Sequence, residues 1–563
     1  MSLRTLLENT HSYLPTLAQQ FKDGKVSRRE FLRTATLLGL SSAAAYSIIG
    51  LPEAGSLTKR ASAAGGTVRI SMRVQPIASP HTYSWIQDSM MARNVIEYLT
   101  LTGSDNVTRP WLCEKWDASD DLKTWTLHLR QDVKWSNGEP FVADHVIWNI
   151  KHCLDPNTGS SVLGLMKGYM LKDVDTGKKD DKGNAVMTTE LWDANAIEKV
   201  DDHTVRLNAQ ASQLAVPEHF FHYPFAMMHP SSNGNFPGVG SLGTGWAEMV
   251  EYDLGKKCVV KKRPGYWHGD GALDSVEYID HGDDPAAALG AIAANQVDGI
   301  WEVKTSQLSA LQKIDRLKLY QSATAQTGVA RMQPIHDTWK DARVRKAMRL
   351  AIDPEKVLQV SYGGNGVPAE HHHVAPVHPE YFKLPFMKQD IEGAKKLLAE
   401  AGVPDGFETE ITAIKDPDWE AKAVTVMAGM WKKIGVKVKV NVLPAAQYWD
   451  IWNLNTNPFS FTSWTHRPLG VMVLGLAYRT GVPWNESFWS NAKFDETLTR
   501  AEGILDVEKR REVMKDLETI MQEDGPIVQP LWRSVFMAMD KKVKGFAAHP
   551  TSYIFPWDWS LEA

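Results

Sequence analysis

The chain has 563 residues, of which 43% are hydrophobic and 23% are charged, and it contains 21 Trp and 15 Tyr. This length exceeds what one compact core supports and the composition is that of a folded protein, so we expect several packed units and exclude disorder for most of the chain. The net charge is −5, and an acidic chain lacks the basic face that a nucleic-acid partner requires.

The first 63 residues carry the features of an export signal. Ser27-Arg28-Arg29-Glu30-Phe31-Leu32 precedes a modestly apolar run over residues 34–50, and Ala61-Ser62-Ala63 follows. A basic stretch, an apolar stretch and an A-x-A site in this order are typical of a signal peptide, and the paired arginines resemble the twin-arginine consensus. We predict export by the Tat translocase, cleavage after Ala63 and a periplasmic location.

Two alternatives exist for this segment. One is an amphipathic cytosolic helix followed by a short buried helix. The other is a membrane anchor, but residues 34–50 include three serines and are at or below the length that crosses a bilayer core of about 30 Å. No Cys follows where a lipoprotein would need one. We therefore expect release of a soluble monomer, with a net charge of −9 because eight of the 62 basic and four of the 67 acidic residues precede residue 64.

Apolar periodicity predicts the elements of the remaining chain. In chain order we expect a strand over 67–74, a strand over 125–130 followed by a turn at 136–138, a helix over 144–154, a surface loop over 173–184, helices over 341–351, 391–401 and 421–434, and a strand over 436–442. Helices that repeatedly lead into alternating strands indicate α/β lobes.

The cysteines indicate no disulfide or metal site. Cys113, Cys153 and Cys258 are odd in number and have no C-x-x-C spacing, so neither a disulfide framework nor a zinc site is supported. We expect them to be core thiols.

Five segments share a pattern known from one protein family. They are residues 110–146, G-T-G at 243–245 with R-P-G-Y-W at 263–267, D-A-R-V-R-K-A at 341–347 with A-I-D at 351–353, residues 394–402, and W-K-K-I-G-V-K-V at 431–438. In this order they resemble the bacterial extracellular solute-binding proteins of the oligopeptide, dipeptide and nickel type, family 5. The likeness covers residues 67–546.

The resemblance implies a fold and a function. The fold would be a two-lobed α/β periplasmic binding protein (type II, cluster C-like) with an extra domain in the N-terminal lobe. The first lobe would comprise residues 64–108, 240–333 and 531–563, the inserted domain 109–239 and the second lobe 334–530. The lobes would close on a small-molecule ligand and present it to the permease subunits of an ABC importer in the inner membrane. No bond is made or broken in such a role, so the chain would not be an enzyme.

Known catalytic and cofactor motifs do not fit. Residues 238–243 match G-x-G-x-x-G, but N-G-N-F-P precedes them and no strand leads in, so dinucleotide binding fails on context. Neither G-x-S-x-G nor H-E-x-x-H occurs. We therefore predict no cofactor and no catalytic residue, with a periplasmic peptide or amide hydrolase as the alternative from another class.

The segment Ser460-Phe-Thr-Ser-Trp-Thr-His-Arg-Pro468 is the most informative about the ligand. In peptide-binding members of the family, a Trp here is followed three residues later by an Asp that pairs with the amino terminus of the ligand. Trp464 matches, but Arg467 occupies the Asp position. A guanidinium favours a carboxylate, sulfonate or phosphate. We predict a peptide or peptide-like, anionic solute, with an internal ion pair of Arg467 as the alternative.

The predicted site draws on a high density of tryptophan. Trp449, Trp452, Trp484, Trp489 and Trp532 could line a cleft with rigid apolar surface, although some must be core. The predicted ligand contacts are Trp464, Thr465, His466, Arg467, Trp484, Asn485, Tyr83 and His371.

A histidine run raises the question of a metal. His371, His372 and His373, with His378 beyond them, have the side chains that suit nickel and zinc. Neighbours on an extended chain point to opposite faces, so a triplet needs a special turn to surround one ion. We predict no metal, and a loop near the cleft with one histidine reaching the ligand. A nickel or metal-chelate carrier is the alternative.

Overall fold

One sheet runs through both halves of the molecule. The computed structural model describes residues 7, 10–50, 65–77, 79–83, 86–179, 183, 185–269 and 271–562. Its largest sheet has twelve strands in the order β10-β11-β12-β1-β13-β20-β14-β18-β16-β17, with β15 beside β20 and β19 beside β14. We call the part around β1 and β10–β13 the first lobe and the part around β16–β18 the second lobe.

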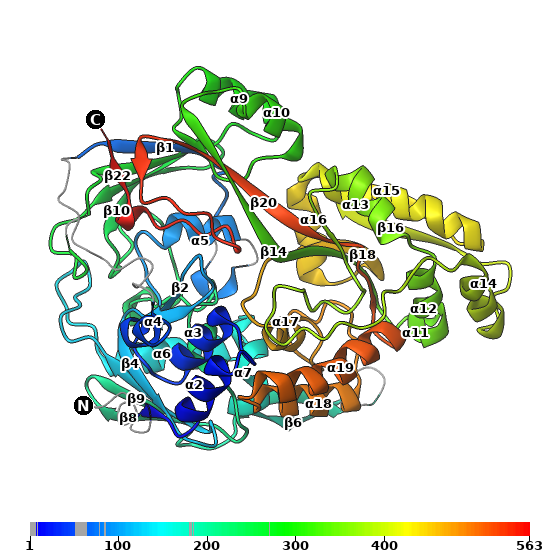
Figure 1. Ribbon diagram of the computed structural model, residues 1–563, viewed down its shortest axis with the longest axis horizontal. Helices are drawn as coiled ribbons and strands as arrows, with labels where there is room; N and C mark the ends of the chain where they lie inside the picture. Colours follow the sequence, from blue (N-terminus) through cyan, green and yellow to red (C-terminus); the bar gives the residue numbers. More distant parts are fainter. Residues whose placement is uncertain are drawn as a thin grey trace.

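Two long strands connect the lobes. β14 (Leu317–Met332) and β20 (Leu531–Asp540) cross from one half of the molecule to the other (Figure 1). Residues 317–322 pair with residues 535–540, the register shifts, and residues 327–332 then pair with β18. A relative movement of the lobes must therefore pass through these strands, which makes them the hinge.

The first lobe has a mixed sheet. The strand predicted over 67–74 is present as β1, which starts at Thr67 but ends at Ser71. β1 runs parallel to β12 and β13. Its elements are β1 (Thr67–Ser71), α5 (Ile86–Ala92), β2 (Thr100–Thr102), β3 (Thr108–Pro110), β10 (Ala247–Asp253), β11 (Lys257–Lys262), β12 (Ser275–Ile279), α9 (Pro285–Ala293), β13 (Gly299–Ile300), α10 (Leu308–Leu311), β21 (Val543–Lys544) and β22 (Ser560–Leu561).

Residues between β3 and β10 form a second sheet. It is antiparallel, in the order β4-β5-β9-β8, and is not part of the twelve-stranded sheet. The elements of this segment are β4 (Cys113–Ala118), β5 (Thr124–Leu129), α6 (Ala143–Leu154), α7 (Val162–Met170), β6 (Leu171–Lys179), β7 (Ala185–Leu191), β8 (Ile197–Asp201), β9 (Thr204–Asn208) and α8 (Val216–His219). The predicted strand over 125–130 and the predicted helix over 144–154 are confirmed.

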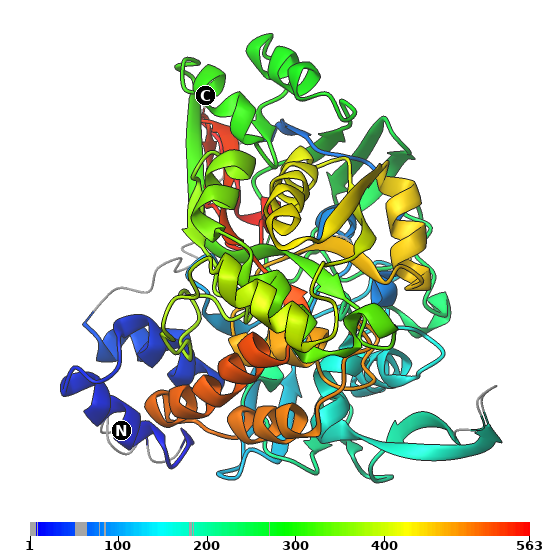
Figure 2. The ribbon, with the colours of Figure 1, turned by 90° about the vertical axis from the view of Figure 1, so that its right-hand side faces the viewer.

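The surface loop predicted over 173–184 is wrong. Residues 173–179 belong to β6, which pairs with β7 as a hairpin that projects from the body (Figure 2). Both faces of the hairpin are largely exposed, so apolar alternation is absent and only the backbone pairing defines the strands.

The second lobe confirms the helices and the strand predicted there. Its elements are α11 (Asp337–Lys340), α12 (Ala342–Leu350), α13 (Pro354–Tyr362), β15 (Gly366–Pro368), α14 (Ile391–Glu400), β16 (Glu408–Ile414), α15 (Asp418–Trp431), β17 (Lys437–Leu443), α16 (Ala445–Leu454), β18 (Phe459–Trp464), α17 (Gly470–Ala477), α18 (Ala492–Glu502), α19 (Val507–Glu523) and β19 (Ile527–Val528). β16 is parallel to β17 and to β18, as expected for strands joined by helices.

The N-terminal segment, residues 10–50, folds into three helices. They are α2 (Leu14–Lys22), α3 (Arg28–Leu37) and α4 (Ser42–Ile48). Ser27 and Glu30 form a capping box at the start of α3, which satisfies two free backbone N–H groups. Among the described residues, no helix is long and apolar enough to cross a membrane. The predicted cleavage site at 61–63 lies outside the described residues.

This N-terminal segment packs against several parts of the body. Arg33 donates to the carbonyl of Asn106, and the indole of Trp116 donates to the carbonyl of Leu37 at 2.9 Å. Gln20 donates to Asp506 at the start of α19 at 2.9 Å. α2 and α3 thus lie beside α18 and α19 in both views (Figures 1 and 2). The segment therefore touches both lobes.

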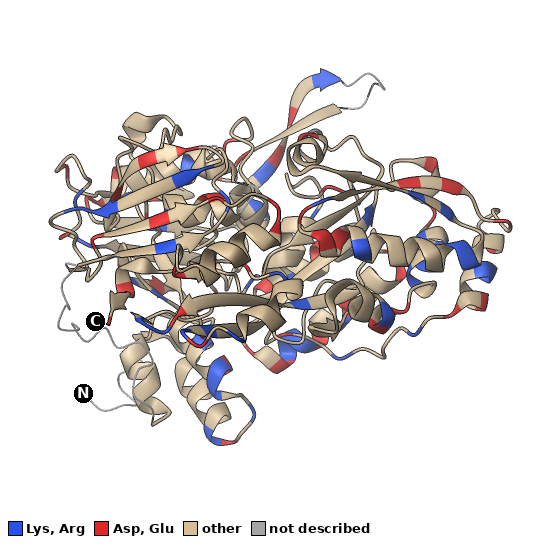
Figure 3. Ribbon diagram, turned by 90° about the horizontal axis from the view of Figure 1, so that it is seen from above, with Lys and Arg blue, Asp and Glu red and all other residues tan. Residues whose placement is uncertain are grey.

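The thiols and the surface charges agree with the sequence. Cys113, Cys153 and Cys258 are buried and free, and burial raises the pKa of the Cys113 thiol to about 12, so it stays protonated and unreactive. In the described part of the chain, acidic and basic residues are interspersed along the ribbon (Figure 3).

Candidate ligand-binding site

A cavity opens between the two lobes. Its empty volume is about 1030 Å³, part of which is open to solvent. The first lobe contributes the end of β1 and the loops after β12 and β13, and the second lobe contributes the segments that start α15 and end α13. The polar and aromatic lining residues are Ser71, Arg73, Gln75, Gln87, His281, Asp283, Asp284, Trp301, Glu302, Lys304, Thr305, Gln307, Tyr362, Asp416, Asp418, Trp419 and Arg533.

Three cations of this cavity already have anionic partners. Lys304 of the first lobe pairs with Asp416 of the second lobe at 2.5 Å. Arg533 pairs with Glu302 at 2.6 Å, and Arg73 pairs with Asp280 at 3.0 Å. Paired charges have little attraction left for a charged ligand, whereas the Lys304–Asp416 pair stabilises the closed arrangement of the lobes.

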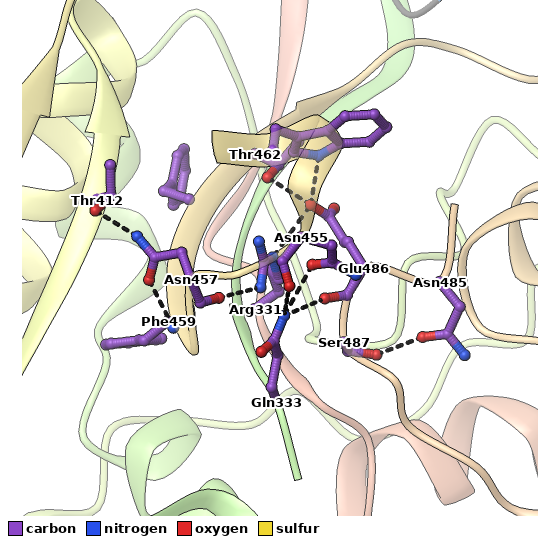
Figure 4. Close-up of polar contacts among 12 residues, drawn as sticks. Arg331, Gln333, Thr412, Asn455, Asn457, Phe459, Thr462, Asn485, Glu486 and Ser487 are labelled. Atoms are coloured by element: carbon purple, nitrogen blue, oxygen red, sulfur yellow. Dashed lines mark hydrogen bonds and ion pairs between the residues drawn. The ribbon is translucent and has the colours of Figure 1, made fainter. Parts of the chain in front are cut away.

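The predicted ligand contacts are not among the residues that line this cavity. Several of them belong to a buried group around Glu486 (Figure 4). Its carboxylate accepts from the indole of Trp464 at 3.2 Å, from the indole of Trp452 at 2.6 Å and from the hydroxyl of Thr462 at 2.9 Å. It also forms a buried ion pair with Arg331 at 3.1 Å. The network ties the end of β18 to the loop between α17 and α18, so the rings are held rigidly.

The predicted Trp464 and Trp484 lie together. Trp464 is the last residue of β18, opposite Thr327 of the hinge strand β14. Its ring is 5.7 Å from that of Trp484 and 5.6 Å from that of His373, both edge to face. Trp484 in turn packs against Tyr223 at 6.0 Å. Aromatic rings from separate segments thus form one apolar wall.

Arg467 is buried and has no ion-pair partner among the described residues. Its Nη1 donates to the hydroxyl of Thr465 at 2.5 Å and to the carbonyl of His466 at 3.1 Å, while its Nε has no partner. The guanidinium carbon lies 5.3 Å from the ring centre of Tyr223 and 6.0 Å from that of Trp484. The internal ion pair considered for Arg467 is therefore absent from the described part of the chain.

His466 joins the lobes. Its Nδ1 accepts from the N–H of Ala325 at 3.0 Å, which leaves Nε2 to donate to the amide oxygen of Asn106 at 3.2 Å. Burial lowers the pKa of His466 far below its usual range, so the ring is neutral. Both nitrogens are occupied, so His466 connects hinge and first lobe through its side chain.

Asn485 supports its own loop. Its amide nitrogen donates to the carbonyls of Tyr478, Arg479 and Trp489, and its oxygen accepts from Ser487. The side chain holds the turn that carries Trp484 and Glu486, which is a positioning task. Trp489, considered as a cleft residue, instead donates to Asp524 and packs on Phe494.

The histidine run adopts an unusual backbone conformation. His371 and His373 have φ of 61° and 62°, in the left-handed region that residues other than glycine rarely adopt. The turn separates their partners. His371 accepts from the N–H of Gln529, His373 shares a hydrogen with Tyr478, and His372 lies 3.5 Å from Glu370. Burial lowers the pKa of His371 to about 3.

The histidine run is not among the groupings with metal-ligand geometry in the described residues. Within the described ranges, the grouping with metal-ligand geometry is Glu139, His145 and His229, in the segment between β3 and β10. It belongs to another part of the chain, and His229 and Glu139 already pair with each other at 2.8 Å.

Several residues beside the site were missed by the sequence reasoning. Asp88, Arg93, Tyr223, Tyr553 and Glu486 come from distant segments, and all are buried. Charged residues inside otherwise apolar helical stretches, such as Asp88 and Arg93 around Met90-Met91-Ala92, were the available signal, because such charges are rarely buried without a task. Tyr83, which was predicted, lies near them, and burial raises its pKa far above the usual range.

Solved structures of binding proteins share this architecture. The Helicobacter pylori periplasmic binding protein DppA, in complex with the peptide STSA, superposes with a TM-score of 0.77 at 18% identity and covers 90% of this chain and 100% of its own. AgaA from A. tumefaciens R10, in complex with agropinic acid, gives 0.76 at 19% identity over 88% of this chain and 99% of its own. The fold is therefore that of two-lobed periplasmic binding proteins.

Sequence comparison leads to the same group. The dipeptide-binding protein DppE of Bacillus subtilis is 24% identical over 82% of this chain and 85% of its own length. The periplasmic oligopeptide-binding protein OppA of Salmonella typhimurium is 23% identical over 80% and 83%. The model of the bacterial extracellular solute-binding proteins, family 5, matches residues 107–479. This chain therefore belongs to the bacterial extracellular solute-binding proteins of family 5.

Proposed function

We propose that this protein is the substrate-binding component of an ABC importer. It captures a small solute, peptide or peptide-like and anionic, between its lobes and delivers it to the permease in the inner membrane. Membership of the family, the hinge formed by β14 and β20, and relatives that bind dipeptides and oligopeptides support this role. Solute binding, and no catalysis, is the activity of the family.

The observation that carries the ligand class is the state of Arg467. The side chain is buried, lies against the rings of Tyr223 and Trp484, and has no carboxylate at ion-pair distance in the described part of the chain. An uncompensated buried cation is costly, and an anionic ligand group removes that cost. Trp464, Thr465, Trp484 and Tyr83 then supply the surrounding surface, with His466, Asn485 and His371 in support.

Mass spectrometry of natively purified protein tests the proposal by identifying the solute that co-purifies. Adding this solute to stripped protein should change Trp fluorescence stoichiometrically and reduce the radius of gyration in small-angle scattering. The variant Arg467→Asp should lose at least tenfold in affinity for it, while an exposed control, Glu355→Gln, keeps the affinity. An unchanged affinity in Arg467→Asp would refute the assignment of the anionic site.

A nickel or metal-chelate carrier is the alternative within the family. NikA of Staphylococcus aureus, solved with Ni(L-His)2, superposes with a TM-score of 0.72. Here the buried histidines 371–373 have separate partners. Nickel retention in equilibrium dialysis that disappears in the triple alanine variant of these residues would establish this alternative. Turnover of a peptide library would instead establish a hydrolase.

The export route forms part of the proposal. Residues 1–63 act as a twin-arginine signal that the Tat translocase recognises, and the mature monomer begins after Ala63 in the periplasm. The exposure of Arg28 and Arg29 on the first turn of α3 supports recognition. Changing both arginines to Lys should leave the precursor in the cytoplasm, which cell fractionation would show. Continued export of this variant would indicate the general secretory route instead.

A further inference from the structure

Four buried side chains, three from the first lobe and one from the second, have polar atoms without hydrogen-bond partners. They are the hydroxyl of Tyr83, Oδ1 of Asp88, Nε and Nη1 of Arg93, and Nε of Arg467. More than nine in ten buried polar groups in proteins are hydrogen-bonded, and each exception costs about 1–3 kcal/mol. A group of such exceptions indicates that a bound molecule supplies the missing partners.

These groups lie around the same tyrosines. The guanidinium of Arg93 is 4.0 Å from the ring centre of Tyr553, and burial raises the pKa of Tyr553 while Arg93 and Arg467 both lower it. Burial raises the pKa of Tyr223, Arg467 opposes the rise, and Tyr553 and Asp88 add to it. Asp88 and Arg467 thus both act on the pKa of Tyr223, and Arg93 and Arg467 both act on the pKa of Tyr553.

The first-lobe groups are close to one another as well. Asp88 lies in α5 and Arg93 directly follows that helix. Beyond the effect of burial, Asp88 is among the charges that raise the pKa of Tyr83, and Arg93 lowers it. Tyr83 therefore lies within electrostatic reach of both charged residues.

The two guanidinium charges of this group are uncompensated, and burial raises the pKa of Asp88 to about 8, so that a nearby ammonium group is what would favour its ionised form. Within the described residues, neither Arg93 nor Arg467 has a carboxylate at ion-pair distance, and Asp88 has no cation at that distance. Arg93 instead stacks on Tyr98, Phe221 and Tyr553. Two unpaired guanidinium groups attract an acidic group, and the free carboxylate oxygen of Asp88 requires a hydrogen-bond donor.

We propose that these groups form one ligand site divided between the lobes, which takes a zwitterion. Arg467 and Arg93 bind the carboxylate of the ligand, and Asp88 with Tyr83 binds its ammonium group. The amino-group partner thus comes from α5 of the first lobe and not from position 467. This inference rests on the proposed function, since it assumes a ligand between the lobes, and it narrows the ligand to a small amino-acid derivative or short peptide.

The test uses matched ligands and matched variants. A panel of free dipeptides and N-carboxyalkyl amino acids is titrated by calorimetry, and the best binder is compared with its N-acetylated and C-amidated forms. Wild type should lose about 10- to 100-fold in affinity for each modified form, the range expected for one charge-assisted hydrogen bond. In Asp88→Asn the penalty for N-acetylation should disappear, and in Arg467→Gln the penalty for C-amidation should disappear.

The controls separate this inference from the function itself. Glu355→Gln removes an exposed carboxylate of the second lobe and should keep both penalties. If Asp88→Asn does not fold, the modified ligands still test the site in wild type. Equal affinity for the free, acetylated and amidated forms, or unchanged penalties in the folded variants, overturns the zwitterion site. Absence of binding across the panel also overturns it, while compaction with another solute would leave the importer role standing.

Discussion

At the residue scale, Glu486 shows how one buried carboxylate positions an aromatic wall. It accepts hydrogen bonds from two indoles and a hydroxyl, and Arg331 balances its charge. A carboxylate with four donors is a rigid junction. Glu486 thus fixes the positions of the tryptophans through bonds within the protein, and it needs no bond from the ligand.

Removing this charge should destabilise the protein strongly. In Glu486→Gln the buried Arg331 loses its counter-charge, and breaking a buried ion pair in this way costs about 3–5 kcal/mol. Urea unfolding followed by Trp fluorescence should show the loss. The double variant Arg331→Met with Glu486→Leu should be less destabilised than the single variant, because no charge is left unpaired. A loss below about 1 kcal/mol in Glu486→Gln contradicts the role of the pair.

A second buried acid makes stability depend on pH. Burial raises the pKa of Glu518 to about 9, with the charges of Glu370 and Glu380 adding to the rise. The folded state therefore keeps a proton that the unfolded state loses above its usual pKa of 4.5. The free energy of unfolding is therefore unaffected by the ionisation of Glu518 below pH 4.5 and decreases as the pH rises from 4.5 to about 9. The decrease is at most about 1.4 kcal/mol per pH unit.

Glu518→Gln should remove this dependence. The neutral side chain fits the same place and keeps an oxygen that can accept from the N–H of Phe382, as Glu518 does at 3.0 Å. We expect the variant to gain stability relative to wild type between pH 5 and pH 8 in chemical unfolding. Parallel stability curves for the two proteins would show that Glu518 is ionised in the folded state.

At the scale of elements, the loops before α15 and after β13 carry the contact between the lobes. Lys304 and Asp416 pair across the cleft, and both side chains are about one quarter exposed (25% and 26%). An exposed pair is worth about 0.2–1 kcal/mol and is screened by salt. The pair therefore adjusts the balance between open and closed forms without deciding it.

Lys304→Met should shift this balance towards the open form. The ligand-free protein should show a larger radius of gyration, and ligand affinity should weaken by about two- to fivefold at low ionic strength. The difference should vanish in 0.5 M salt, where the screening length is only a few ångströms (~4 Å). Lys437→Met, which removes the exposed Lys437–Glu408 pair inside the second lobe, should change neither quantity.

The elements also show what a sequence allows one to predict. The helix α14 and the strand β17 follow from spacing alone, because each buries one face of a regular pattern. The hairpin β6–β7 was missed because both of its faces are exposed. At the proposed site, Trp464 and Arg467 were predicted through motif position. Asp88, Arg93 and Tyr553 were not, because they are distant from Arg467 in the sequence and belong to no motif that links them to it.

At the scale of the whole molecule, the N-terminal segment behaves as part of the fold. Phe31, Leu32 and Leu38 are buried, and Gln20 and Arg33 reach the second lobe and the first lobe. The proposed cleavage after Ala63 would remove these contacts. The precursor and the mature form should therefore differ in stability although they share the same ligand site.

A chain that starts at residue 64 should melt at a lower temperature than the full chain. A decrease of about 1 kcal/mol in the free energy of unfolding lowers the melting temperature of a large domain by about 2–4 °C. Scanning calorimetry resolves such a difference. Trp116→Phe provides a matched control, since it removes the bond to Leu37. The substitution should destabilise the full chain more than the shortened one. Equal melting temperatures of the two chains would show that the segment adds no stability.

The contact of the N-terminal segment with both lobes has a thermodynamic consequence. A ligand between the lobes and a segment that holds them from outside both favour the same closed form, so each strengthens the binding of the other by the same factor. A precursor that has already taken up its solute would release the segment less readily than an empty one. Export from the cytoplasm would then favour ligand-free protein, because the segment is released more readily from it. The segment would thus select precursor molecules by their ligand occupancy before export.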